Sequence, residues 1–88
     1  MDRPERRRYA TPMTRDETLD ACGLLCPLPV LKLRKRLKSL DIGAVIALRA
    51  DDPAAVVDVP HFCMESGHEL VSTEDEGPVR TYLIRKTA

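Results

Sequence analysis

The sequence has few aromatic residues, no tryptophan and no net charge. Among its 88 residues, Tyr9, Phe62 and Tyr82 are the only aromatic ones, and 14 basic residues balance 14 acidic ones. Three aromatics do not provide the stacking surface on which single-stranded nucleic acids bind. No apolar run approaches the roughly 18 residues of a membrane span, and the N-terminus lacks the apolar segment of a secretory signal. We therefore expect a cytoplasmic protein that does not engage membranes.

The short chain and its three cysteines limit the chemistry further. A chain of 88 residues makes one small domain, which leaves little room for an enclosed substrate pocket, so the chemistry should lie at the surface. Cysteines of a cytoplasmic protein stay reduced, so each is core filler, a ligand or a reactive thiol. The spacings of Cys22 and Cys26, and of His61, Cys63 and His68, match no common zinc site. No metal or other cofactor is expected.

The N-terminal segment differs in composition from the rest of the chain. Residues 1–15 contain five arginines and two prolines without apolar periodicity, which predicts a disordered basic extension. Met13 is an alternative start of the protein. The folded domain is expected over residues 16–88.

Hydrophobic periodicity predicts six elements in the order βαβαββ. The expected strands are residues 18–21, 44–50, 68–74 and 79–86, and the expected helices are residues 27–40 and 53–66. Asp52 precedes Pro53 as a helix cap, and the interior Pro60 predicts a break in the second helix near residues 58–60. The expected fold is α+β, a two-layer α/β sandwich with both helices on one face of a four-stranded mixed sheet.

Apolar residues at helical spacing define the expected core. The first helix should bury Val30, Leu33, Leu37 and Leu40, and the second should bury Val56, Val59, Phe62 and Cys63. Cys63 is therefore read as packing rather than chemistry, because free cysteine is among the most buried residue types.

Cys26 lies at the start of the first helix, within Cys26-Pro27-Leu28-Pro29. The prolines fit a first helical turn, where backbone amides have no intrahelical partners, and they make that turn rigid. The positive end of the helix dipole and the remaining free amides should stabilise a thiolate at Cys26. Because His61 and His68 belong to the second helix and its end, a Cys/His dyad of the protease type is weakly supported.

The segment from Leu19 to Val30 resembles the CPxP signature of the TusA-type sulfur carriers, also called the SirA-like family. The resemblance extends over about residues 18–87. It includes the segments Asp51–Ala54, Asp58–Cys63, Gly67–Leu70 and Tyr82–Lys86, in order and spacing. It implies a sandwich fold like the one expected above and a sulfurtransferase that acts as a stoichiometric sulfur carrier. Cys26 would carry the sulfur, with Asp20, Gly23, Pro27 and Pro29 as supporting motif residues.

The family's activity implies two protein partners and no cofactor. Cys26 would accept sulfane sulfur, as a persulfide, from a donor such as a cysteine desulfurase and pass it to the thiol of a downstream acceptor protein. The usual end product in such proteins is the 2-thio group of a wobble uridine in tRNA. Relatives also serve sulfur oxidation, selenium handling and molybdenum-cofactor enzymes, and the signature does not separate these branches.

Charge segregation suggests how a partner would dock. Residues 27–40 carry five bases and no acid, whereas residues 41–88 are acidic. We expect Lys32, Lys35 and Arg36 to lie opposite the apolar stripe and to bind acidic surfaces of a partner protein. The protein itself is expected to be a monomer.

Three alternatives stay open. The basic helix could serve a nucleic-acid-binding or regulatory module. If the protein is instead a sulfur relay, no direct contact with nucleic acid is expected. A disulfide between Cys22 and Cys26 could act as a thiol redox switch. A pure adaptor would dock a partner without needing the thiol.

Overall fold

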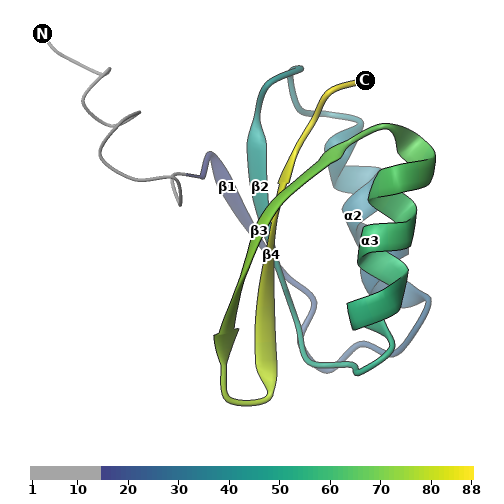
Figure 1. The fold of residues 1–88 in the computed structure, drawn as a ribbon, viewed down its shortest axis with the longest axis vertical. Coiled ribbons are helices and arrows are strands. Elements are labelled where there is room, and N and C mark those ends of the chain that lie inside the picture. Colours follow the sequence, from purple (N-terminus) through teal and green to yellow (C-terminus); the bar gives the residue numbers. More distant parts are fainter. Residues whose placement is uncertain (1–14) are drawn as a thin grey trace, which may run out of the picture.

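A computed structural model describes residues 15–88, which form a four-stranded sheet covered on one face by two helices (Figure 1). The elements are β1 (Glu17–Asp20), α2 (Leu28–Leu37), β2 (Val45–Ala50), α3 (Ala55–Ser66), β3 (Glu69–Glu76) and β4 (Val79–Arg85). The strand order is β1-β2-β4-β3, with β1 parallel to β2 and the other neighbours antiparallel. The predicted α+β sandwich, its element order and its mixed sheet are confirmed.

The core lies between the sheet and the two helices. Ile46 and Leu48 of β2 pair with Ile84 and Tyr82 of β4, and all four side chains are buried. The helices contribute buried residues at helical spacing to the same cluster: Leu33 and Leu37 from α2, and Ala55, Val59, Phe62 and Cys63 from α3. Burying one such aliphatic or aromatic side chain contributes about 1.5–3 kcal/mol, so this layer fixes α2 against α3.

Helix α2 ends three residues earlier than predicted. Beyond Leu37 the chain tightens, because the amides of Ser39 and Leu40 donate to carbonyls three residues back, at 3.1 Å each. Val30 and Leu40 are half-buried and pack against the core, so the predicted apolar stripe is confirmed even though its last member lies outside the helix.

Helix α3 differs from its prediction in three ways. It begins at Ala55 rather than Pro53, because its N-cap is Ala54 and not the predicted Asp52. It runs to Ser66 without the break predicted near Pro60. Pro60 costs the helix one hydrogen bond, to the carbonyl of Val56, and Val56 lies on the exposed side of the helix, where water can replace that bond. The predicted burial of Val56 is also wrong, since its side chain is 45% exposed and Ala55 occupies the core position.

The β3–β4 hairpin is tighter than predicted. Glu76 pairs with Val79, so only Gly77 and Pro78 form the turn, where four turn residues were expected. Gly77 has φ +62°, a conformation that glycine adopts without steric cost, and this permits the two-residue connection.

Residue 15 is the first that the structure describes, so the predicted extension lies outside the described residues except for Arg15. The Arg15 guanidinium pairs with the Glu74 carboxylate of β3 at 3.1 Å. None of the helices in the described part of the chain is long and apolar enough to cross a bilayer.

Candidate functional site

Cys26 lies on the loop between β1 and α2, and its side chain is exposed as predicted. Pro27 caps α2 and follows a cis peptide bond after Cys26, while Pro29 is buried in the first helical turn. The Leu24 amide donates to the Ala21 carbonyl at 3.2 Å, closing a turn in which Gly23 has φ +84°.

Three carboxylates hold the backbone of this loop. Asp20 accepts from the amide of Cys22 at 2.9 Å, Asp51 from the amide of Gly23 at 2.9 Å, and Asp52 from the amide of Cys26 at 2.5 Å. Asp20 ends β1 and the other two follow β2, and the carboxyl ends of adjacent parallel strands meet at one edge of a sheet. The parallel pairing therefore brings the three acids to the loop that carries Cys26.

The Cys26 thiol donates a hydrogen bond to Asp58. The Sγ–Oδ2 distance is 2.7 Å, and Asp58 lies half-buried in the first turn of α3. This hydrogen bond to Asp58, together with desolvation and the negative charges of Asp58 and Asp52, raises the pKa of the Cys26 thiol above its ordinary value.

The expected stabilisation of a thiolate by the start of α2 is therefore wrong. Pro27 and Pro29 have no amide hydrogen, the Cys26 amide is bound to Asp52, and the Leu28 amide donates to the carbonyl of Leu25 at 2.8 Å. The four residues of the motif thus leave no free amide for the sulfur, and the acidic neighbours decide the direction of the pKa shift.

A groove between α2 and α3 leads away from Cys26; we call it the interhelical groove. It is lined by Cys26, Pro27, Val30 and Arg34 on one side and by Asp58, His61, Phe62 and Glu65 on the other. Arg34 lies over the Phe62 ring, with its Cζ 5.7 Å from the ring centroid, and His61 contacts Glu65 at 3.3 Å. The groove is open, so a partner's side chain can reach the sulfur from solvent.

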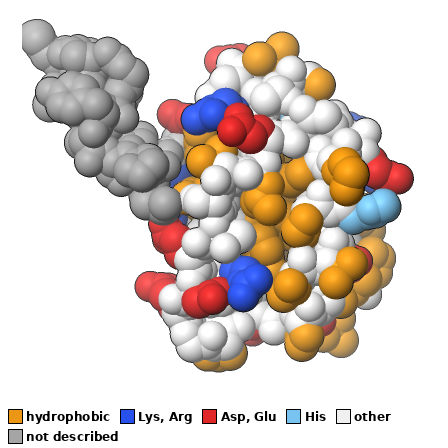
Figure 2. Space-filling model, viewed as in Figure 1, with side chains coloured by type: hydrophobic (Ala, Val, Ile, Leu, Met, Phe, Trp, Pro, Cys, Tyr) orange, Lys and Arg blue, Asp and Glu red, His pale blue; other side chains and the backbone are white. Residues whose placement is uncertain are grey.

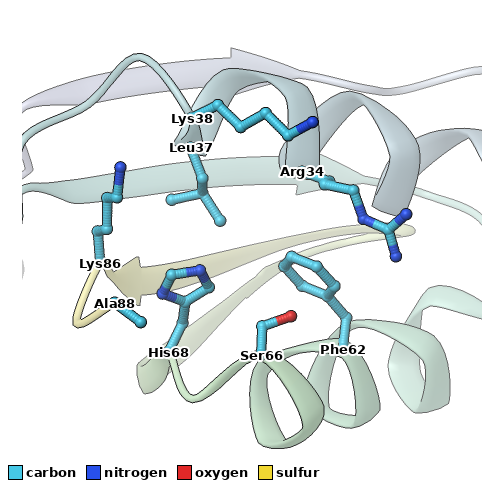
Figure 3. A pocket seen from close by; sticks show the side chains of 8 residues that line it. All are labelled: Arg34, Leu37, Lys38, Phe62, Ser66, His68, Lys86 and Ala88. Atoms are coloured by element: carbon cyan, nitrogen blue, oxygen red, sulfur yellow. The ribbon is translucent and has the colours of Figure 1, made fainter.

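A second pocket continues the groove beyond Arg34 and Phe62, which border both. Figure 3 shows Phe62, Ser66 and His68 pointing from the α3 side towards Leu37 and the bases of α2. Lys38 and Lys86 also line it, so this end is basic, whereas the Cys26 end is acidic.

Hydrophobic side chains are exposed on both sides of the site. Figure 2 shows many hydrophobic side chains on the α3 side of the visible face. On α3, Val57 and Met64 are 70% and 76% exposed, and Leu25, next to Cys26 in the loop, is 69% exposed.

The predicted basic face of α2 is only partly available. The Lys32 ammonium donates to the Asp20 carbonyl at 2.7 Å, and the Arg36 guanidinium binds both carboxylate oxygens of Glu17. Lys35 makes no ion pair within residues 15–88. Two of the three predicted docking residues therefore fasten α2 to β1, and Lys35 alone of the three stays free for a partner among the residues described.

The other cysteines have different environments. Cys63 is buried, which confirms the packing interpretation, and burial raises the pKa of its thiol to about 11. Cys22 is half-buried, and desolvation together with Asp20 raises the pKa of its thiol. All three thiols are free in the structure, so a Cys22–Cys26 disulfide stays a prediction. The described residues contain no group of three or more ligands placed to hold a metal ion.

Three carboxylates of the site are not predicted from the sequence. The sequence predicts Asp52 only as a helix cap and does not predict its bond to the Cys26 amide. Asp51 and Asp52 follow a strand parallel to β1, which was a usable signal for their position. Asp58 lies 32 residues beyond Cys26 on another element, and no local pattern points to it.

Comparisons with known proteins found a matching family model and a solved structure with a similar fold. A family model described as sulfurtransferase TusA matches residues 17–86. The crystal structure of a SirA-like protein from Desulfitobacterium hafniense superposes with a TM-score of 0.71. That protein is 24% identical, and the alignment covers 82% of this chain and 99% of the other. The likeness to it shows the same fold.

Proposed function

Because the chain belongs to the TusA sulfurtransferase family, we propose that it is a sulfur-relay protein in which Cys26 accepts sulfane sulfur as a persulfide and passes it on. The donor would be a cysteine desulfurase or another persulfide-bearing protein. The acceptor would be the thiol of a downstream protein, with thiolation of tRNA wobble uridine as the end use.

The observation that carries this proposal is the way in which the structure holds Cys26 in place. Its exposed sulfur lies on a loop whose backbone is held by Asp20, Asp51 and Asp52, ahead of a proline-stiffened helix. A relay needs a cysteine that is rigidly placed yet accessible to another protein's active site, and neither a metal nor a deep pocket is required.

The chemistry is thiol exchange. The Cys26 sulfur attacks the outer sulfur of the donor persulfide, a new S–S bond forms, and the donor cysteine leaves as a thiolate. In the second step the acceptor thiolate attacks the outer sulfur on Cys26, and Cys26 returns to a thiol. The hydrogen bond to Asp58 raises the pKa of the Cys26 thiol, so the attack has to displace its proton.

Surface features around Cys26 suit a protein partner. The exposed Leu25 and Leu28 flank the sulfur, and the free Lys35 would steer an acidic surface towards them. We place the relay in the cytoplasm, where the three free thiols would stay reduced.

Sulfur loading tests the proposal directly. The wild-type protein, incubated with a cysteine desulfurase and cysteine, should gain the mass of one sulfur atom, and a reductant should remove it. Cys26→Ser should gain none, whereas Cys22→Ser, the matched control from the same loop, should load normally. Undiminished loading of Cys26→Ser would refute the assignment.

A further inference from the structure

The hydrogen bond from Cys26 to Asp58 has a consequence for when the sulfur reacts. A relay cysteine attacks as a thiolate, yet Asp58 accepts the hydrogen that the thiol must lose. A carboxylate in this position stabilises the protonated sulfur and destabilises any negative charge on it.

Other charged groups around Cys26 do not cancel this effect. On the α2 side of the groove the base is Arg34, which lies over the Phe62 ring. On the α3 side, His61 contacts Glu65, and behind the loop Asp52 adds a second negative charge through its bond to the Cys26 amide. The local field at the sulfur is therefore set by carboxylates.

We propose, on the basis of the sulfur-relay function, that Asp58 is a positioning residue that holds the thiol of the empty carrier protonated in the interhelical groove and repels the same group once it carries an ionised persulfide. The thiol of the empty carrier is thus held against α3 by its hydrogen bond to Asp58. The loaded carrier has no proton to donate, so its outer sulfur turns away from Asp58 towards the open side of the groove.

The hydrogen bond between Cys26 and Asp58 leaves the chemistry of sulfur loading balanced. The Cys26 thiol and the donor persulfide yield the Cys26 persulfide and the donor thiol: the new S–S bond replaces the old one, and the proton from Cys26 neutralises the leaving thiolate. No external oxidant or reductant is needed. Because a persulfide is more acidic than the thiol it replaces, loading converts a hydrogen-bond donor facing Asp58 into an anion.

This arrangement protects the empty carrier as well as presenting the sulfur. Alkylating agents and peroxides attack thiolates, so a protonated Cys26 resists them although its side chain is exposed. An exposed cysteine without such a carboxylate would react with the same agents in proportion to its thiolate fraction.

The first test measures the alkylation rate of Cys26 by iodoacetamide against pH, in a Cys22→Ser background that leaves one accessible thiol. Asp58→Asn should shift the profile to lower pH and speed alkylation about threefold for each tenfold gain in thiolate, because nucleophilicity falls as the pKa falls. Glu65→Gln, which removes a carboxylate from the same groove without touching the sulfur, should leave the profile in place. Slower alkylation of Asp58→Asn would identify Asp58 as a proton acceptor that activates the thiol, and would overturn the proposal. An unshifted profile would overturn it as well.

A second variant and a second reaction separate this inference from the relay itself. Asp58→Ser also removes the charge and should shift the profile in the same direction, with folding of both variants verified by circular dichroism. In the loaded state, excess dithiothreitol should take the outer sulfur and release it as sulfide while its two thiols form a disulfide. This release should be slower from Asp58→Asn than from wild type, because the persulfide is no longer repelled; equal or faster release would overturn the proposal. Failure of the wild-type protein to load any sulfur would refute the relay function, and the alkylation profiles would still decide the role of Asp58.

Discussion

The carboxylate of Asp52 joins the backbone of Cys26 to the start of α3. One of its oxygens accepts from the Cys26 amide at 2.5 Å, and the other accepts from the Ala54 amide at 3.2 Å. Ala54 directly precedes the helix that carries Asp58, so a single side chain fixes the loop with the sulfur relative to the helix with its hydrogen-bond acceptor. The distance between Cys26 and Asp58 therefore depends on Asp52.

Replacement of Asp52 should affect both stability and sulfur transfer. Asp52→Ala removes the acceptor of the Ala54 amide in the turn before α3, and loss of one such hydrogen bond costs about 0.5–1.5 kcal/mol of unfolding free energy. Loading of Cys26 by a desulfurase should also slow, because the loop loses its bond to the Cys26 amide. Chemical denaturation and the loading rate measure the two effects. Glu76→Ala, at the exposed end of β3, is the control and should change neither; wild-type loading by Asp52→Ala would contradict the positioning role.

The fold could be predicted closely because its determinants are local. Leu33 and Leu37 repeat at helical spacing, and Gly67 ends α3 with φ +81°, so the order and approximate limits of the elements follow from neighbouring residues. The break predicted at Pro60 failed for a reason that local sequence does not contain. The helix is held to the core by Val59 and Phe62, and that packing outweighs one lost hydrogen bond on the exposed side.

The position of the site could be predicted from the sequence, but the direction of the pKa shift of Cys26 could not. The loop before a proline-rich helical turn identified Cys26 as an exposed cysteine. The direction of its pKa shift depends instead on Asp58, which reaches the sulfur through the packing of α3 against α2, and on Asp52, which the pairing of β1 with β2 brings to the loop. Contacts across 26 and 32 residues leave no periodicity in the sequence, so charge placement around a thiol has to be read from the structure.

The two exposed bases Lys35 and Arg36 should behave differently on substitution. Arg36→Ala breaks the paired hydrogen bonds to Glu17 and should lower the unfolding temperature by about 1–4 °C, as expected for an exposed ion pair. Lys35→Ala removes no hydrogen bond or ion pair within residues 15–88 and should leave that temperature nearly unchanged. In stopped-flow binding to an acidic sulfur donor, Lys35→Ala should slow association at low salt and approach the wild-type rate at high salt. Equal association rates at low salt would exclude Lys35 from docking.

Cys63 should stay unreactive in the folded protein. It is 2% exposed, and burial raises the pKa of its thiol to about 11, so neither access nor ionisation favours alkylation at neutral pH. Counting alkylated thiols by mass spectrometry should find Cys63 modified only in denaturant. Cys63→Ser places a hydroxyl among apolar side chains and should cost about 1–3 kcal/mol of stability, more than Cys63→Ala. Modification of Cys63 in the native protein would show that α3 opens readily.

His68 should make the stability of the domain sensitive to acid. Its Nδ1 accepts a hydrogen bond from the Thr87 amide at 3.2 Å, so the ring is neutral in this arrangement. Burial, and secondarily the charge of Lys86, lowers the pKa of His68 below 6.5. The unfolded chain therefore takes up the proton more readily than the folded one, and stability is lost as pH falls below about 6.5.

Thermal unfolding between pH 8 and pH 5 tests this contribution of His68. Protonation removes the acceptor for Thr87, a loss on the order of 1 kcal/mol, so the wild-type unfolding temperature should fall across this range. His68→Asn, whose Oδ1 can accept the same amide without titrating, should flatten the part of the curve below pH 6.5. His61→Gln, at the exposed histidine beside Glu65, removes the other imidazole and is the matched control, so only a flattening specific to His68→Asn supports this contribution. An unchanged slope for His68→Asn would assign the acid sensitivity to carboxylates such as Asp20, whose bond to the Cys22 amide lowers its pKa and is lost at more acidic pH.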